Sequence, residues 1–356
     1  MTLQPKLVGL AELAELLSVT KQAISNWRNR WPDFPSPVAE LRSGPIWDFN
    51  TVEEWANTKG LELSHPGNGP SSVNEVRSAK VVSMVNMKGG VGKSTLAANL
   101  GWYCAWRKDK KVLLVDLDPQ FNLSQYVLGN DAYEAHLEKN KPTVIDIFEQ
   151  FTPSLNSSKK KRSDLQESIC KVREWPEAGR IDLIPSKLEL AWTLKNPHHK
   201  EHLLRDFLQD LKTRYDLIII DAPPTESVLT LAAYRASDFL LVPVRPEFLA
   251  TIGLPLLARS LEDFQGMFKN ESAPEIAGIL FNDASGKPEH SRSRTYVNKL
   301  AKANGWYVFK NELSHSDSYA AGARAGRPIF LTDYARSWKK AEFNRLAEEF
   351  LERVPL

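Results

Sequence analysis

A glycine-rich segment between an apolar run and a helix-like run constrains this chain most. Residues 81–85 are mainly apolar, residues 86–95 read Asn-Met-Lys-Gly-Gly-Val-Gly-Lys-Ser-Thr, and residues 96–100 have a helix-forming composition. A strand, a tight loop and a helix start in this order bring backbone N–H groups and the positive end of a helix dipole to one point. The segment therefore predicts a phosphate-binding loop at the end of a strand.

The side chains of this loop suit a nucleotide with a bound metal ion. Glycines at 89, 90 and 92 let backbone N–H groups approach phosphate oxygens, because no Cβ stands in the way. Lys93 stands where it reaches the β- and γ-phosphates, and the Ser94 hydroxyl is placed to ligate Mg²⁺. A turn that binds nothing would need neither side chain. The expected cofactors are ATP and Mg²⁺, and the expected nucleotide contacts are Lys88, Gly89, Gly90, Val91, Gly92, Lys93, Ser94 and Thr95.

The loop is a variant of the usual pattern, with Met87 where a glycine normally stands and Lys88 as an additional lysine. Residues 88–94 resemble the deviant Walker A motif of the ParA/MinD ATPases. The resemblance implies that Lys88 reaches across a nucleotide-sandwich homodimer to the phosphates of the partner. It also implies that Lys88 and Lys93 take part in catalysis.

Length and composition indicate two domains. A chain of 356 residues exceeds one average domain, and the stretch 61–79 contains Pro, Gly, Asn and Ser with few large apolar side chains. We expect residues 1–60 to form one domain, residues 61–79 a linker and residues 80–356 a second domain. No apolar run approaches the roughly 20 residues of a membrane span, and Cys104 and Cys170 are far apart without metal-type neighbours. These features predict a cytoplasmic protein that has no membrane partner.

The second domain alternates strand-like and helix-like runs. Continuous apolar strands that are separated by helices predict an α/β fold with a mostly parallel, doubly wound sheet. The resemblance implies that this fold is of the P-loop NTPase, deviant Walker A class. The expected strands are residues 81–85, 112–115, 181–184, 217–220, 239–242 and 276–281, with a further candidate at 306–309.

Two carboxylates follow the second expected strand directly. Asp116 and Asp118 alternate to the same side at its carboxyl end, where α/β sheets keep their ligand sites. On chemistry alone either could polarise a water molecule, and the alternative is that both cap the next helix. The resemblance to ParA implies that Asp118 handles the attacking water as a catalytic residue and that Asp116 supports the magnesium site.

Three further segments match the same family. The run 216–220 ends in Asp221 and has the form of a Walker B element, so we expect Asp221 to hold Mg²⁺ through water. Pro223 and Pro224 would fix the loop below the γ-phosphate. The resemblance implies that Asn282 contacts adenine and that residues 183–186 lie on the dimer face.

The first sixty residues predict a small, mainly helical domain. Apolar residues between 10 and 17 recur at helical spacing, residues 20–31 can form a second helix, and the two resemble the winged helix-turn-helix of MerR-like and AlpA-like regulators. Residues 43–49 would form a hairpin wing, and Asn50 would cap a helix through Trp55. Ile24 and Trp27 would face the first helix. The DNA-contacting face would consist of Lys21, Gln22, Ser25, Asn26 and Arg28. The alternative is a domain that only packs or dimerises.

The final seventy residues carry a surplus of positive charge. Residues 287–356 contain 13 Lys and Arg against 8 Asp and Glu, whereas residues 1–60 contain 6 against 7. The resemblance to ParA implies nonspecific DNA binding through basic residues near the C-terminus. The alternative is that these basic residues only form a solvated face. The candidates are Arg324, Arg327, Arg336, Lys339 and Lys340. The last helix has an apolar stripe and an acidic polar face, which favours packing over membrane binding.

The residues predict nucleotide binding, and the resemblance implies a slow ATPase that dimerises with ATP, binds DNA nonspecifically in that state and is stimulated by a partner. The resemblance implies partition or positioning of plasmid or chromosomal DNA, a nucleoid-associated location and a ParB-like centromere-binding protein as partner. Binding to an operator through the first domain would add autorepression. The alternatives are a nucleotide-switched, sequence-specific transcriptional regulator, and an ATPase that positions a non-DNA cargo or serves a defence complex.

Overall fold

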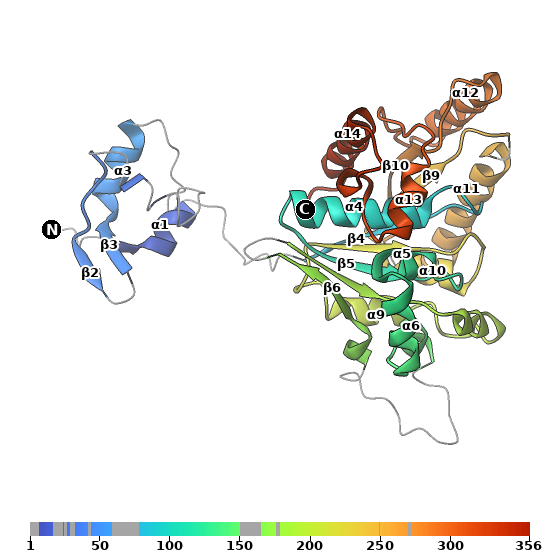
Figure 1. Cartoon of the computed structure of the whole chain (residues 1–356), viewed down its shortest axis with the longest axis horizontal. Helices are drawn as coiled ribbons and strands as arrows, with labels where there is room; N and C mark the ends of the chain where they lie inside the picture. Colours follow the sequence, from blue (N-terminus) through green and yellow to red (C-terminus); the bar gives the residue numbers. More distant parts are fainter. Residues whose placement is uncertain are drawn as a thin grey trace. The chain divides into compact units, whose positions relative to one another are not determined.

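The computed structural model divides into two compact units, Met1–Glu75 and Val76–Leu356. It describes residues 7–16, 24, 27–28, 33–41, 44–58, 78–149, 165–175, 179–248, 250–269 and 272–356. Most of the expected linker, from residue 61 to residue 77, lies outside the described residues. Figure 1 labels helices and strands of both units.

The first unit contains a small antiparallel sheet as well as helices. Its elements in chain order are β1 (Leu7–Gly9), α1 (Leu10–Leu16), β2 (Ala39–Leu41), β3 (Gly44–Asp48) and α3 (Phe49–Thr58). The strand order is β1-β3-β2, and Val8 lies opposite Trp47 in the register. The expected hairpin at 43–49 was therefore placed too late. Those residues form one strand and a helix start, and the partner strand β2 precedes them.

A core of its own holds the first unit together. Leu13, Ile24 and Trp47 are fully buried in one apolar cluster, and the Trp47 Nε1 donates to the Pro35 carbonyl at 2.9 Å. Ile24 faces inward as expected. The start of α3 corrects another prediction, since Asp48 rather than Asn50 supplies the capping oxygen and accepts from the Asn50 N–H at 2.9 Å.

The second unit is built on a seven-stranded sheet with the order β10-β9-β4-β8-β5-β7-β6. All neighbours are parallel except β6, which runs antiparallel to β7. The six strands expected from the sequence are confirmed, β6 was not expected, and residues 306–309 contribute a bridge between Ile279 and Val308 instead of a strand. The strands are β4 (Lys80–Met84), β5 (Lys111–Asp116), β6 (Cys170–Glu174), β7 (Arg180–Ile184), β8 (Leu217–Asp221), β9 (Phe239–Val244) and β10 (Glu275–Phe281).

Helices cover both faces of this sheet (Figure 1). Alternate residues of β8 enter different apolar clusters, since Ile218 and Ile220 pack with one and Leu217 and Ile219 with the other. The sheet is therefore doubly wound, as predicted. The first face is packed by residues of α7 (Val144–Phe148), α9 (Leu203–Gln209), α10 (Val228–Ala236), α11 (Ala250–Met267) and α12 (Pro288–Ala303), and the second by residues of α4 (Lys93–Arg107), α5 (Asn122–Leu128) and α14 (Ser337–Arg353).

The remaining elements are short. They are α6 (Asn130–Glu138), α13 (Ser318–Arg324) and the 3₁₀ segments Gln166–Ser168, Leu188–Lys195 and Ile329–Leu331. The expected apolar stripe of α14 packs against the second face of the sheet, where Phe343, Leu346 and Phe350 are buried. Among the described helices, none has the length and apolar character needed to cross a membrane.

Candidate nucleotide-binding site

The phosphate loop joins β4 to α4 at the centre of the sheet. Helix α4 begins at Lys93, and its N-cap residue Gly92 has a φ of 93°, in the left-handed region that favours glycine. A Cβ on Gly92 would lie 2.2 Å from the Nδ2 of Asn282. That amide instead donates to the Val91 carbonyl at 2.8 Å. Asn282 therefore braces the loop from the end of β10, and its expected contact with adenine stays a prediction.

Lys93 lies back across the loop that precedes it. Its Nζ donates to the carbonyls of Asn86 at 3.3 Å and Lys88 at 3.4 Å, and the residue is 6% exposed. Burial lowers the pKa of Lys93, while the charges of Asp221 and Asp118 act in the opposite direction. The ammonium group thus lies inside the phosphate-binding loop, which we call the cradle, and a bound phosphate would supply an opposite charge there.

Two acids face each other at the carboxyl ends of neighbouring strands. Asp116 on β5 pairs in register with Asp221 on β8, and both are fully buried. Burial is the largest cause that raises the pKa of each, and for Asp116 the charge of Asp221 adds to it. The Ser94 hydroxyl lies close enough to Asp221 to lower the pKa of this carboxyl, yet neither Asp221 oxygen accepts a hydrogen bond of normal geometry. An orphaned, buried carboxylate beside a hydroxyl fits a cation such as Mg²⁺.

The described residues hold no cluster of three His, Cys, Asp or Glu that would bind a metal ion by itself. That is the usual situation of Mg²⁺, which keeps several waters and takes phosphate oxygens with one or two protein ligands. Ser94 and Asp221 are the residues that would hold it here.

Asp116 accepts hydrogen bonds from Ser124 and from the backbone of Asp118. Its Oδ2 accepts from both the N–H and the hydroxyl of Ser124, at 2.8 and 2.6 Å, and its Oδ1 accepts from the Asp118 N–H at 3.2 Å. The Ser124 hydroxyl in turn accepts from the Ser186 N–H at 2.9 Å. Asp116 therefore fixes the start of α5 to the segment that follows β7, and its role at the metal stays a prediction.

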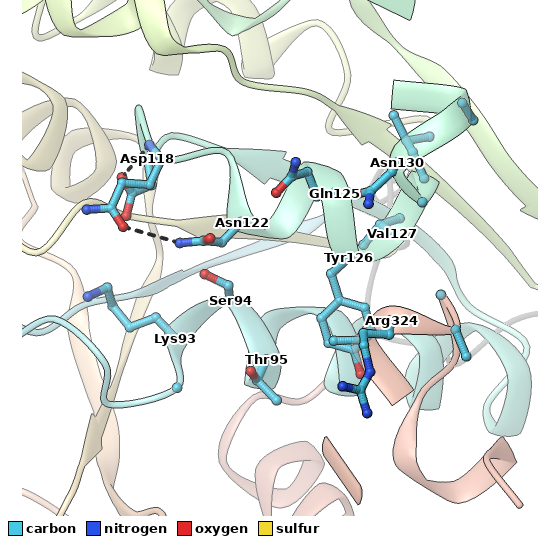
Figure 2. A pocket seen from close by; sticks show the side chains of 18 of the residues that line it. Lys93, Ser94, Thr95, Asp118, Asn122, Gln125, Tyr126, Val127, Asn130 and Arg324 are labelled. Atoms are coloured by element: carbon cyan, nitrogen blue, oxygen red, sulfur yellow. Dashed lines mark hydrogen bonds between the residues drawn. The ribbon is translucent and has the colours of Figure 1, made fainter. Parts of the chain in front are cut away.

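Asp118 reaches the same cavity as the phosphate loop (Figure 2). It is 7% exposed, and its Oδ1 accepts from the Gln120 N–H at 2.9 Å. Burial raises its pKa, while the Gln120 N–H and the charge of Lys93 lower it. A carboxylate that is held by its own turn and aimed at a cradle is suited to orient a water molecule.

Lys88 forms an ion pair within its own chain. Its Nζ lies 2.6 Å from the Oε2 of Glu247, which stands between β9 and α11. The hydrogen bond from Lys88 is the largest cause that lowers the pKa of Glu247, and Arg245 also approaches this carboxylate at 3.1 Å. No local pattern in the sequence predicts this pair, because the partners are 159 residues apart.

A cavity of about 1150 Å³ opens over the loop. Its wall includes Asp118, residues of α5 and α6, and the loop residues Gly89, Gly90, Gly92, Lys93, Ser94 and Thr95. Arg324, expected to contact DNA, also lines it (Figure 2). The structure thus brings together the loop residues, Lys93, Asp118 and Asp221 as expected, and it adds Arg324.

The other expected DNA contacts are not gathered in this way. Lys21, Gln22, Ser25 and Asn26 lie outside the described residues. The Arg28 guanidinium is paired with Glu40. Lys339 corrects a prediction, since it is 2% exposed and bonded to Ser314 and Glu342, so its charge does not face solvent. Arg327 and Arg336 are exposed, and Lys340 is half-buried.

Fold and site together define a P-loop nucleotide-binding ATPase. The AAA domain family AAA_31 matches residues 79–273, which is more than half of the chain. The chain belongs to this family and is a ParA-type P-loop ATPase.

Relatives with similar sequences come from several organisms. An uncharacterized protein of Methanocaldococcus jannaschii is 31% identical over 77% of this chain and 99% of its own length. The chromosome partitioning protein ParA of Caulobacter vibrioides is 27% identical over 77% of this chain and 94% of its own. Among solved structures, an ATP complex of McdA from Cyanothece superposes with a TM-score of 0.62 at 19% identity, covering 78% of this chain and 97% of that one. This last likeness supports the fold.

Proposed function

We propose that this chain binds ATP with Mg²⁺ at the phosphate loop, hydrolyses it, and acts in the partition or positioning of plasmid or chromosomal DNA. The observation that carries the proposal is the unpartnered, buried carboxylate of Asp221 beside Ser94, in a cradle that also holds the Lys93 ammonium. Such a site is poorly satisfied when empty and is completed by a hydrated cation and phosphates. The names of its relatives, ParA of Caulobacter vibrioides among them, support the biological role.

Each residue has a separate task in this proposal. Lys93 neutralises the β- and γ-phosphates from inside the loop, and Ser94 and Asp221 hold the metal ion. Bound Mg²⁺ would supply charge compensation on the phosphate oxygens. Asp118 orients the attacking water, and Asn282 keeps the loop in its binding conformation through Val91.

The additional lysine supports an ATP-dependent homodimer. Lys88 would leave Glu247 and reach the phosphates of a second copy in a nucleotide sandwich. The ion pair at 2.6 Å gives the free monomer an alternative partner for the same ammonium group. Turnover is therefore slow in the isolated chain and rises when a partner protein favours the catalytic arrangement.

The start of α14 is the surface that we assign to nonspecific DNA binding. Arg336 is exposed and Lys340 half-buried there, and Tyr334 and Trp338 expose 71% and 54% of their surface beside them. Basic residues supply the phosphate contacts that dominate nonspecific affinity. DNA held in this way would place the protein on the nucleoid, with a ParB-like centromere-binding protein as the stimulating partner.

A regulator that binds a specific operator is the second candidate function. The first unit favours it, because its own buried core of Leu13, Ile24 and Trp47 can present an independent recognition surface. Substitution of Lys21 by Glu would abolish operator binding in that case, and would leave ATP-dependent binding to random DNA unchanged. An ATPase that positions a non-DNA cargo would show neither effect.

The ATPase itself is tested by turnover of the full chain in Mg²⁺ and ATP. Lys93→Ala should lose both nucleotide affinity and turnover, whereas Asp118→Ala should keep affinity and lose turnover by about 10² to 10⁴-fold. Unchanged turnover in Asp118→Ala would remove this residue from the mechanism. Absence of nucleotide binding in the wild-type chain would refute the proposal as a whole.

A further inference from the structure

Arg324 occupies an unexpected place for a DNA contact. It is the last residue of α13 and lines the cavity above the phosphate loop, together with Ser94 and Thr95. Figure 2 shows Arg324, Tyr126 and Thr95 on the same flank of the cavity. No ion pair to a carboxylate is found for Arg324 among the described residues, and Arg324 is exposed at the wall of the cavity.

The turn after α13 is fixed to the helix that begins with the loop. Asn99 on α4 is fully buried, and its Nδ2 donates to the Thr95 carbonyl at 2.7 Å and to the Tyr126 hydroxyl at 2.9 Å. Its Oδ1 accepts from the Ile329 N–H at 2.7 Å. The Tyr126 hydroxyl donates to the Arg327 carbonyl at 3.2 Å. One buried amide thus connects the Thr95 turn, α5 and the chain on the far side of Arg324.

Close packing restricts this turn further. A Cβ on Gly322 would lie 2.7 Å from the Arg327 carbonyl oxygen, so the backbone at 322 and 327 is in direct contact. The backbone that carries Arg324 is therefore held at both sides, and the freedom that remains is in its side chain. An arginine whose backbone is anchored in this way loses less entropy on binding an anion than one on a free loop.

We propose that Arg324 is a phosphate-binding residue of the nucleotide site, which contacts the α- and β-phosphates from the Thr95 side of the loop. This inference rests on the proposed binding of ATP at the loop. Lys93 and the metal ligands Ser94 and Asp221 serve the γ-phosphate end, and Arg324 approaches from the other flank. Arginine is suited to this place, since its planar fork can bridge oxygens of two neighbouring phosphates.

The test is equilibrium binding of ATP and ADP, each with Mg²⁺, to the full chain. Arg324→Gln should weaken both nucleotides about tenfold, as expected for the loss of a charge-assisted hydrogen bond, and Arg324→Lys should recover part of the loss. Arg345→Gln is the matched control, because Arg345 is an exposed arginine on α14 outside the cavity. It should bind both nucleotides as the wild type does.

Three results would overturn the inference. Unchanged affinity in Arg324→Gln would remove the contact, and a loss confined to ATP would move it to the γ-phosphate. Weaker binding of random duplex DNA with intact nucleotide affinity would return Arg324 to the DNA surface. Failure of the proposed function is distinguishable, because the wild-type chain would then bind neither nucleotide and Lys93→Ala would change nothing.

Discussion

Substitution of Gly92 by Ala tests how the phosphate loop is held. Gly92 has a φ of 93°, and an alanine in the left-handed region costs about 1–2 kcal/mol. The new Cβ would lie 2.2 Å from the Asn282 Nδ2 and would displace its hydrogen bond to Val91. Loss of that bond costs about 0.5–1.5 kcal/mol. We expect the free energy of unfolding of the nucleotide-free chain to fall by about 2–3 kcal/mol.

Thermal and denaturant unfolding measure this change. For a unit of this size, the expected loss corresponds to a decrease in Tm of roughly 4–12 °C. Gly89→Ala is the control within the same loop, because its added Cβ meets no heavy atom within 4 Å. It should remain within about 0.5 kcal/mol of the wild type.

A double mutant separates the two contributions. Asn282→Ala removes the amide that the Gly92 Cβ would meet, so Gly92→Ala in that background should cost only the backbone term of about 1–2 kcal/mol. Equal costs of Gly92→Ala in the two backgrounds would show that Asn282 does not brace the loop. A stability unchanged by Gly92→Ala would refute the reasoning altogether.

Three further predictions concern charge. In metal-free protein, burial raises the pKa of Asp221 to about 7, so its ionisation reduces stability as pH rises from about 4 through 7. Asp221→Asn should therefore be more stable than the wild type at pH 8, by on the order of 4 kcal/mol for a shift of about three pKa units, and equal to it near pH 4. Urea unfolding at both pH values measures this, and an equal difference in stability at the two pH values would contradict it. Lys88→Ala should keep most of the nucleotide affinity but lose turnover and ATP-dependent dimerisation. Sedimentation in ATP measures the dimerisation, and turnover equal to that of the wild type would exclude a role of Lys88 across the dimer. Arg336→Glu with Lys340→Glu should weaken binding of random DNA and flatten its dependence on salt, and an unchanged salt slope would remove this surface from the interface.

The fold was predictable because its strands carry strong local signals. Residues 217–220 are Leu-Ile-Ile-Ile and end in an acid, and the structure buries all of β8 at the centre of the sheet. Strand β6 shows the opposite case. Its residues Cys170–Glu174 read Cys-Lys-Val-Arg-Glu, and as an antiparallel edge strand it is largely solvated, so neither composition nor a buried run marked it.

Much of the site was predictable for a similar reason. Lys93, Ser94 and Asp118 follow shortly after the ends of β4 and β5. The positions of these strand ends in the sheet therefore determine where the three side chains lie. Lys339 was not predictable, because its charge alone suggested the surface. Its hydrogen bond to Ser314 forms only when α14 packs on the preceding loop, whereas Glu342 lies one turn further along the same helix.

Contacts between distant segments explain what the sequence could not reveal. Asn99 lies inside a run that reads as an ordinary helix, yet its amide joins Thr95, Tyr126 and the backbone at Ile329. The Lys88 pair with Glu247 likewise depends on β9 lying beside β4. Such pairs arise from sheet order, which local pattern does not encode.

Affinity for random-sequence duplex DNA, measured at one salt concentration in Mg²⁺ with ADP and then with ATP, tests the central claim most directly. The proposed ATP-dependent dimer should bind the DNA tightly with ATP and at least tenfold more weakly with ADP. Binding that is the same with both nucleotides would contradict the account and would favour the regulator or an ATPase with another cargo.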